Sequence, residues 1–218
     1  MTGPRALVAV FVALWLGFVA WYGGNGTPMT AQEKDALFAQ IERNAAGQHE
    51  GDGTLLEKLH RLADQDDGKE FFMVNLIRYN AVAKYPPGSP YGGTGLDADA
   101  RYSKAILPLL LKHGNVPVFV SEVQGRFLDE AGDPEWHRVA IVRYRSRRDL
   151  LKMVEDLAGK PVGIHKWASI ERTQVVPTRM TINLVFVRGF VAAVLAVLGL
   201  GLHLLLRWLS PRYAGKGN

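Results

Sequence analysis

Polar side chains inside otherwise apolar segments are the residues of this sequence best placed to do chemistry. Asn75 interrupts the run FFMVNLIR, and Glu122 interrupts VPVFVSEVQG. Burying such groups without a partner costs roughly 1–3 kcal/mol, so they are kept when they are satisfied or used. We expect Asn75 either to bind a ligand carbonyl or to pair with a backbone group across a sheet. Glu122 is a candidate catalytic general base, with an ion pair to a strand arginine as the alternative.

Arg78 and Arg143 are the arginines that such an ion pair would use. Their guanidinium groups would otherwise bind an acidic substrate through a bidentate contact. His137 follows Trp136 at the start of another apolar run. Because an imidazole ordinarily titrates near neutral pH, His137 is a candidate catalytic proton shuttle, with a surface histidine at a strand end as the alternative.

Four tyrosines fall in and around one Pro- and Gly-rich stretch, NAVAKYPPGSPYGGTGL. They are Tyr79, Tyr85, Tyr91 and Tyr102. We expect them to line the mouth of an aromatic pocket, or else to pack on the domain. Tyr79 and Tyr102 complete a ligand-binding set with Asn75, Arg78 and Arg143.

Several classes of chemistry have no support in the sequence. Cysteine is absent, so there is no thiol nucleophile and no thiolate metal site. The histidines lack metal-ligand spacing, and no nucleophile elbow, P-loop or dinucleotide fingerprint is present. We therefore expect no metal and no cofactor. The net charge is +5, but basic residues are scattered apart from Arg143, Arg145, Arg147 and Arg148, which favours a membrane-proximal surface over nucleic-acid binding.

Both ends of the chain are strongly apolar. Ala6 to Tyr22 and Gly189 to Leu206 carry no charged residue and are each about long enough to cross a bilayer. For the first segment, a cleaved secretory signal is the alternative. We predict two membrane-spanning helices that contact lipid.

Basic residues outside the two segments set the orientation. Arg5 precedes the first, and Arg212 and Lys216 follow the second, so both tails are predicted to be cytoplasmic. Residues from about Met29 to Met180 then face outward. In a bacterium this predicts a two-pass inner-membrane protein with a periplasmic central domain.

The first half of the central domain contains three expected helices and one strand. Thr30 opens a capping box and a helix, TAQEKDALFAQIERNA, and a second helix covers Thr54 to Ala63 after the Gly51-Asp52-Gly53 break. Phe71 to Arg78 has the length and composition of a buried strand. Asn80 to Leu96 is a loop, and Asp97 to His113 is a helix.

The second half alternates strands with a helix. Val116 to Gly125 and His137 to Tyr144 form a predicted hairpin. Ser146 caps a helix at Arg147 to Leu157, and Trp167 to Val176 is the last strand before Pro177. The order strand, helix, strand, strand, helix, strand is that of the α+β, ferredoxin-like split βαβ arrangement. One sheet face is left uncovered, which predicts a homodimer.

The segments FFMVNLIRYN, PEWHRVAIVRYRSRRDLLKMV and HKWASIERTQVVPT resemble the DUF1330-type dimeric α/β barrel domains. The resemblance covers about residues 70 to 178 and implies a fold, a dimer and a pocket, with no defined reaction. The expected organisation is an N-terminal tail and span (1–28), a helical lead-in (29–68), the barrel domain (69–180), a second span (181–208) and a tail (209–218).

Two functions are compatible with these patterns. The first is a membrane-anchored small-molecule-binding barrel, such as a cofactor-free oxidoreductase or isomerase, with Asn75, Glu122 and Arg143 in one pocket between sheet and helices. The alternative is a dimeric membrane-surface scaffold or sensor that is not an enzyme.

Overall fold

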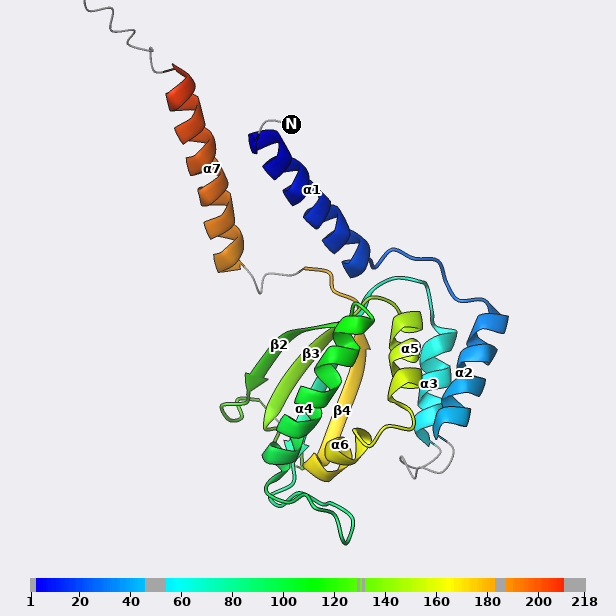
Figure 1. The fold of residues 1–218 in the computed structure, drawn as a ribbon. Coiled ribbons are helices and arrows are strands. Elements are labelled where there is room, and N and C mark those ends of the chain that lie inside the picture. Colours follow the sequence, from blue (N-terminus) through cyan, green and yellow to red (C-terminus); the bar gives the residue numbers. More distant parts are fainter. Residues whose placement is uncertain (1–2, 46–53, 129, 131, 183–186, 210–218) are drawn as a thin grey trace, which may run out of the picture. The chain divides into compact units, whose positions relative to one another are not determined.

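The computed structural model describes residues 3–45, 54–128, 130, 132–182 and 187–209 (Figure 1). The predicted break at 51–53 and the basic tail residues Arg212 and Lys216 lie outside the described residues. The chain forms two compact units, Met1–Arg179 and Met180–Asn218.

The first unit begins with three helices. They are α1 (Gly3–Tyr22), α2 (Ala31–Ala45) and α3 (Thr54–Asp64). The two lead-in helices were predicted, and the Thr30 hydroxyl accepts a hydrogen bond from the Glu33 amide at 3.1 Å, as an N-cap should. Arg148 of α5 (Arg147–Leu157) donates from Nε to Glu33 Oε1 at 2.6 Å, and this ion pair joins α2 to α5.

Four strands form one antiparallel sheet with the order β2-β3-β1-β4. Their bounds are β1 (Phe71–Tyr79), β2 (Val116–Glu122), β3 (Arg138–Tyr144) and β4 (Ile170–Thr178). The predicted four-stranded sheet and its β2–β3 hairpin are confirmed.

Three further helices connect or flank the strands: α4 (Gly95–Lys112), α5 (Arg147–Leu157) and α6 (Gly163–Ser169). Ser146 caps α5 as predicted, by accepting a hydrogen bond from the Asp149 amide. The prediction of a strand from Trp167 was wrong, because Trp167 belongs to the short helix α6. The strand β4 instead continues through Pro177, which an edge strand tolerates because one of its sides has no hydrogen-bonded neighbour.

One sheet face carries the helices. Ile106 and Leu110 of α4 pack with Met153 of α5 against Val142 and Tyr144 of β3. A second cluster joins α5 and the first strand to the lead-in helices α2 and α3. In Figure 1, α4 crosses this face on the near side.

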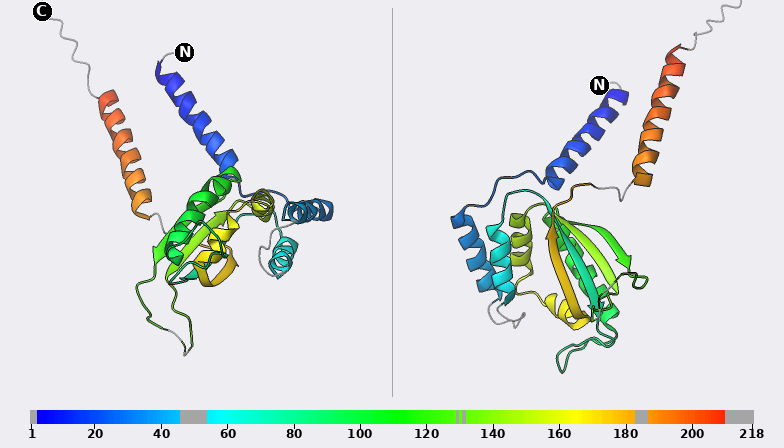
Figure 2. Two further views of the ribbon diagram at one scale, coloured as in Figure 1. Left: turned by 60° about the horizontal axis from the view of Figure 1, so that its bottom comes forward. Right: turned by 180° about the vertical axis from the view of Figure 1, so that it is seen from behind.

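The opposite face has apolar side chains that the register places together. Phe72, Val74 and Leu76 of β1 alternate away from the helix-bearing side, and Ile141 is the partner of Val74. At the two edges, Phe119 and Val176 are 36% and 39% exposed. Seen from behind in Figure 2, this face is not crossed by any of the helices drawn from the first unit.

The second unit contains one described helix, α7 (Val187–Leu209). The two segments predicted as membrane spans are thus the helices α1 and α7. Among the described residues, no helix meets the length and apolarity needed to cross a bilayer.

Candidate functional site

The end of α1 is fixed to the domain by a buried arginine of β3. Arg143 is completely buried, and its Nη1 donates to the carbonyl oxygens of Tyr22 at 2.8 Å and Gly114 at 3.0 Å. Its Nη2 donates to the Gly23 carbonyl at 3.2 Å, and both Nε and Nη2 lie 2.8 Å from Glu70 Oε2. All five N–H groups of the guanidinium therefore have an acceptor.

These contacts suit the end of a helix. The last carbonyl groups of an α-helix lack partners within the helix, and the C-terminal end carries partial negative charge. Arg143 supplies both the donors and the positive charge, and its guanidinium carbon also lies 3.6 Å from the centre of the Tyr22 ring. Arg143 was predicted to bind a ligand, with an ion pair to Glu122 as the alternative, and its carboxylate partner is Glu70. The structure instead places its whole donor set on the chain itself.

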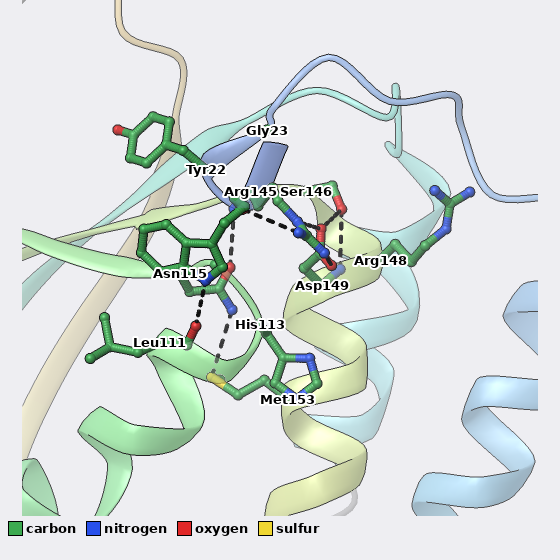
Figure 3. Close-up of polar contacts among 12 residues, drawn as sticks. Tyr22, Gly23, Leu111, His113, Asn115, Arg145, Ser146, Arg148, Asp149 and Met153 are labelled. Atoms are coloured by element: carbon green, nitrogen blue, oxygen red, sulfur yellow. Dashed lines mark hydrogen bonds and ion pairs between the residues drawn. The ribbon is translucent and has the colours of Figure 1, made fainter. Parts of the chain in front are cut away.

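A second arginine extends this junction. Arg145 donates from Nη1 to the Trp21 carbonyl at 3.2 Å, and from Nε and Nη2 to both oxygens of Asp149 (Figure 3). Burial raises the pKa of the Asp149 carboxyl, but the hydrogen bonds from Arg145 and Ser146 more than offset this and hold the pKa below its ordinary value. Asn115 is fully buried, and its Oδ1 accepts from the Arg145 amide at 3.0 Å.

Glycine is needed at two positions of the junction. Gly24 has φ +108°, and a Cβ there would lie 2.6 Å from Arg143 Nη2. Gly114 has φ +68°, and a Cβ there would lie 2.8 Å from the Trp21 carbonyl oxygen. Both positions combine left-handed backbone with close approach, so any side chain would push α1 away from the domain.

Another buried polar network lies at the opposite end of β1 and β3. Tyr79 donates from its hydroxyl to Asp99 Oδ2 at 2.9 Å, and Arg138 Nη1 donates to the same oxygen at 2.8 Å. The Arg138 guanidinium carbon lies 5.4 Å from the centre of the Tyr79 ring. Burial first, and then the Asp99 carboxylate, raise the pKa of Tyr79, so the hydroxyl keeps its proton. Among the described residues, Arg138 Nε is buried without a hydrogen-bond partner.

His137 lies beside this network. Its Nδ1 accepts a hydrogen bond from the Tyr79 backbone amide at 3.1 Å. In the neutral ring, this leaves the proton on Nε2. His137 also borders a hollow of about 630 Å³ beneath the β2–β3 connection. The hollow is lined by Val123, Phe127, Leu128, Pro134, Trp136 and the charged residues around them.

Glu122 lies close to His137 along the hairpin. It ends β2 opposite Arg138, and the next residue, Val123, donates from its amide to the His137 carbonyl at 3.0 Å. The carboxyl group is exposed. The two predicted catalytic residues are thus backbone neighbours at one end of the sheet, but of the two only His137 lines the hollow.

The other predicted ligand-binding residues are dispersed. Asn75 donates from Nδ2 to the carbonyl oxygens of Met73 at 3.0 Å and Ala140 at 3.1 Å, which is the backbone pairing given above as the alternative. Arg78 binds Glu171 at 2.9 Å and is half-buried. Tyr102 packs in the core between α4 and α5.

The expectation that Asn75, Glu122 and Arg143 share one pocket was wrong. Asn75 is paired with Ala140, and Arg143 with Phe72, so Asn75 and Arg143 point to opposite faces of the antiparallel sheet. Glu122 is paired with Arg138 at the far end of β3. The sequence pattern correctly predicted that each of the three residues lies in a strand. It did not predict which face of the sheet, or which end of the strand, each residue occupies.

Two of the loop tyrosines pack on the domain around a histidine that the sequence did not single out, which is the alternative given above. The Tyr85 hydroxyl lies 2.8 Å from His165 Nδ1, and the Tyr91 ring meets the His165 ring edge-on at 4.6 Å between centroids. Arg101 donates from Nη1 to the Gly92 carbonyl at 2.8 Å. This cluster ties the loop to α4 and α6.

The sequence reading missed Asp99, Arg138 and Asp149. Asp99 lies in the predicted helix Asp97 to His113 but was given no role of its own, and of these two acidic residues only Asp97 caps the helix, through Thr94. An acidic residue one turn before an apolar helical stripe is the signal that would have identified Asp99. Within the described residues, no group of histidine and carboxylate side chains has the geometry of a metal site.

No family model matches the chain, and no curated protein sequence matches it. Two crystal structures are similar, both of the RPA0582 protein of unknown function from Rhodopseudomonas palustris. One is 21% identical with a TM-score of 0.52, and covers 61% of this chain and 96% of that chain. The methylated form is 22% identical with a TM-score of 0.53, and covers 63% and 98%. This likeness shows an α/β fold in common.

Proposed function

We propose that this chain is a two-pass membrane protein whose α/β domain is a binding or sensor module fixed at the outer surface of a bilayer. The observation that carries the proposal is the contrast along α1. Its large apolar side chains from Val10 to Val19 are between 46% and 64% exposed, whereas its last turn is bound by Arg143 and Arg145. An all-round apolar helix with exposed side chains suits lipid, and the arginine junction makes that helix continuous with the domain.

The two points where the chain enters and leaves the sheet of the first unit lie at the same end of the sheet. Asn25 forms an isolated bridge with Lys69, just before β1 begins. Thr178, at the end of β4, pairs with Phe72 at the start of β1. A chain that enters and leaves a domain at the same end of its sheet suits a hairpin topology, in which both apolar segments insert in the same bilayer.

The orientation follows from the basic flanks: both tails inside, and the domain outside. In a bacterial host the domain is then periplasmic, and the protein belongs to the inner membrane. The strand order and the two helices on one face also support a ferredoxin-like, DUF1330-type barrel. In such a barrel, the open face with Leu76, Phe119 and Val176 is covered by a second copy of the chain. A standard interface buries about 800 Å² per partner.

The natural absence of cysteine gives a clean topology test. Single-cysteine variants Phe127→Cys and Phe11→Cys would be treated, in intact cells with a permeabilised outer membrane, with a maleimide that does not cross the inner membrane. Phe127 is 93% exposed on the domain, so Phe127→Cys should react at once. Phe11→Cys should stay protected even after lysis without detergent. Recovery of the protein in the soluble fraction, or protection of Phe127→Cys until lysis, would refute the anchored, outward-facing module.

A second candidate function is small-molecule binding at the hollow beside His137. It is favoured by the apolar lining with Trp136 and by the polar His137 ring. A cofactor-free oxidoreductase or isomerase at this hollow would use His137 as its acid or base, whereas Glu122 is not among the residues that line the hollow. Fluorescence of 1-anilinonaphthalene-8-sulfonate, an apolar anion, tests the site. Trp136→Ala and His137→Ala should weaken its binding relative to Leu55→Ala, and equal binding by all three variants would exclude the hollow.

A further inference from the structure

Two exposed leucines form an apolar surface on the last turns of α4. Leu107 is 42% exposed and Leu111 is 39% exposed, and residues four apart lie on the same side of a helix. Exposed Lys104 and Lys112 flank them. We call these four residues the leucine surface.

The leucine surface adjoins the end of α1. Trp21 donates from its indole Nε1 to the Leu111 carbonyl at 3.0 Å. Just after the end of α4, Gly114 approaches α1 so closely that a Cβ at this position would clash with the Trp21 carbonyl oxygen. The C-terminal turn of α4 therefore lies at the level where α1 leaves the domain.

We propose that the leucine surface rests on the lipid interface of the bilayer that holds α1. This inference rests on the proposed membrane anchor, since Trp21 and Tyr22 would then lie at the headgroup level that aromatic residues favour. Apolar side chains flanked by a lysine match that layer, because the leucines enter the acyl boundary while the Lys104 ammonium stays among the headgroups. At the same helix end, Lys112 is ion-paired with Asp156.

The same helix supplies a matched control. Leu96 is 48% exposed, the same residue type in the same helix, and it lies 15 positions before Leu111. At about 1.5 Å per residue this separates the two leucines by roughly 22 Å along the axis. A general tendency of exposed leucines to meet lipid would affect both positions, whereas docking of the α4 end affects Leu111 alone.

The experiment places a nitroxide spin label at single cysteines in the full chain. The variants are Leu111→Cys, Leu107→Cys, Leu96→Cys and Phe11→Cys, reconstituted in phosphatidylcholine vesicles after circular dichroism has shown an unchanged helix content. Collision rates with oxygen, which partitions into lipid, and with a water-soluble nickel chelate report the depth of each label. We expect a severalfold higher ratio of oxygen to nickel collisions at 111 than at 96, with 107 between them.

The outcomes separate the two proposals. If the label at 11 contacts lipid but the label at 111 is as accessible to nickel as the label at 96, the docked surface is refuted and the anchor stands. If the label at 11 is in water, the anchor itself fails. A label at 111 shielded from both reagents would mean that protein covers the leucines, which also overturns the lipid contact.

Discussion

Two arginines at opposite ends of β3 show how differently the same side chain is used in this domain. Arg143 and Arg138 are both largely buried, and each binds a carboxylate, Glu70 or Asp99. Arg143 has an acceptor for each of its five N–H groups, three of them backbone carbonyls around the end of α1. Arg138 has a buried Nε for which the described residues supply no acceptor.

The difference separates a structural joint from a candidate binding site. A fully satisfied guanidinium holds chain segments in place, and it gains nothing from a further ligand. A buried donor without a partner costs roughly 1–3 kcal/mol, which a ligand with an acceptor atom would recover. The satisfied Arg143 therefore fixes α1 to the domain, whereas Arg138 keeps one buried donor that the described residues leave unused, as Arg147 Nε also does.

The largest effect is expected from Arg143→Met. The substitution leaves the carbonyl groups of Tyr22, Gly23 and Gly114 without donors and removes the partner of Glu70, so the free energy of unfolding should fall by about 3 kcal/mol or more. Urea unfolding of the detergent-solubilised protein measures this loss.

The control is Arg78→Met, which breaks a half-exposed ion pair with Glu171 and should cost at most about 1 kcal/mol. Equal losses for the two variants would mean that Arg143 is no more than an ordinary surface charge.

A smaller effect is expected from Gly24→Ala. The new methyl group would need a left-handed backbone at φ +108° and would lie 2.6 Å from Arg143 Nη2. We expect a loss of about 1–3 kcal/mol in unfolding free energy, together with a lower melting temperature. Gly92→Ala meets no atom within 4 Å and should change stability by less than about 0.5 kcal/mol. A Gly24→Ala protein as stable as Gly92→Ala would show that the close packing on Arg143 is dispensable.

Much of the fold could be predicted because its signals are local. Ser146 and Thr30 are capping residues that mark the start of a helix within four residues of themselves. The apolar run of β1 and the alternation in β2 likewise mark strands from neighbouring residues alone. The helix α6 was missed because its seven residues, GIHKWAS, run directly into the apolar start of β4. A helix this short has too few turns to show a period.

The site could be predicted only in part because its partners are distant in the sequence. Arg143 was identified, but its acceptors at Tyr22 and Gly23 lie 121 and 120 positions away. Residue type indicates that a strand arginine needs partners, and it cannot indicate that helix carbonyls supply them. His137 and Glu122 came together because a hairpin is itself a local feature.

At the Arg138 end, Tyr79→Phe should have a modest effect. The variant loses only the hydroxyl that donates to Asp99, while Arg138 continues to neutralise the carboxylate, so about 1 kcal/mol of stability should be lost. Tyr91→Phe, with a ring that is 45% exposed, is the matched change and should cost less than about 0.5 kcal/mol. A loss of unfolding free energy as large as that of Arg143→Met would mean that the Tyr79 network is as important for stability as the Arg143 junction. The contrast between the two ends of β3 would then be weaker.

The smallest effect should be a pH dependence of how firmly the loop 80–94 is held against the domain. Burial first, and then the Arg101 guanidinium, lower the pKa of His165 below its ordinary value of 6.5, so the folded state favours the neutral ring. The unfolded or released ring binds a proton more readily, and the contacts of the loop weaken as the pH falls from about 6.5 through the lowered pKa. A protonated Nδ1 can no longer accept from the Tyr85 hydroxyl, and the added charge meets Arg101.

Thermolysin cleavage of the loop, normalised to an unstructured peptide at each pH, would measure this release between about pH 7 and pH 5. Cleavage should accelerate severalfold in acid for the natural chain and for the control variant His60→Asn. His60 belongs to α3, where it stacks on Phe38 of α2 and is distant in sequence from the loop. It should be independent of pH in His165→Asn, because that side chain does not titrate. Acid release that persists in His165→Asn would assign the titration to another group and would leave the Tyr85–His165 contact as packing alone.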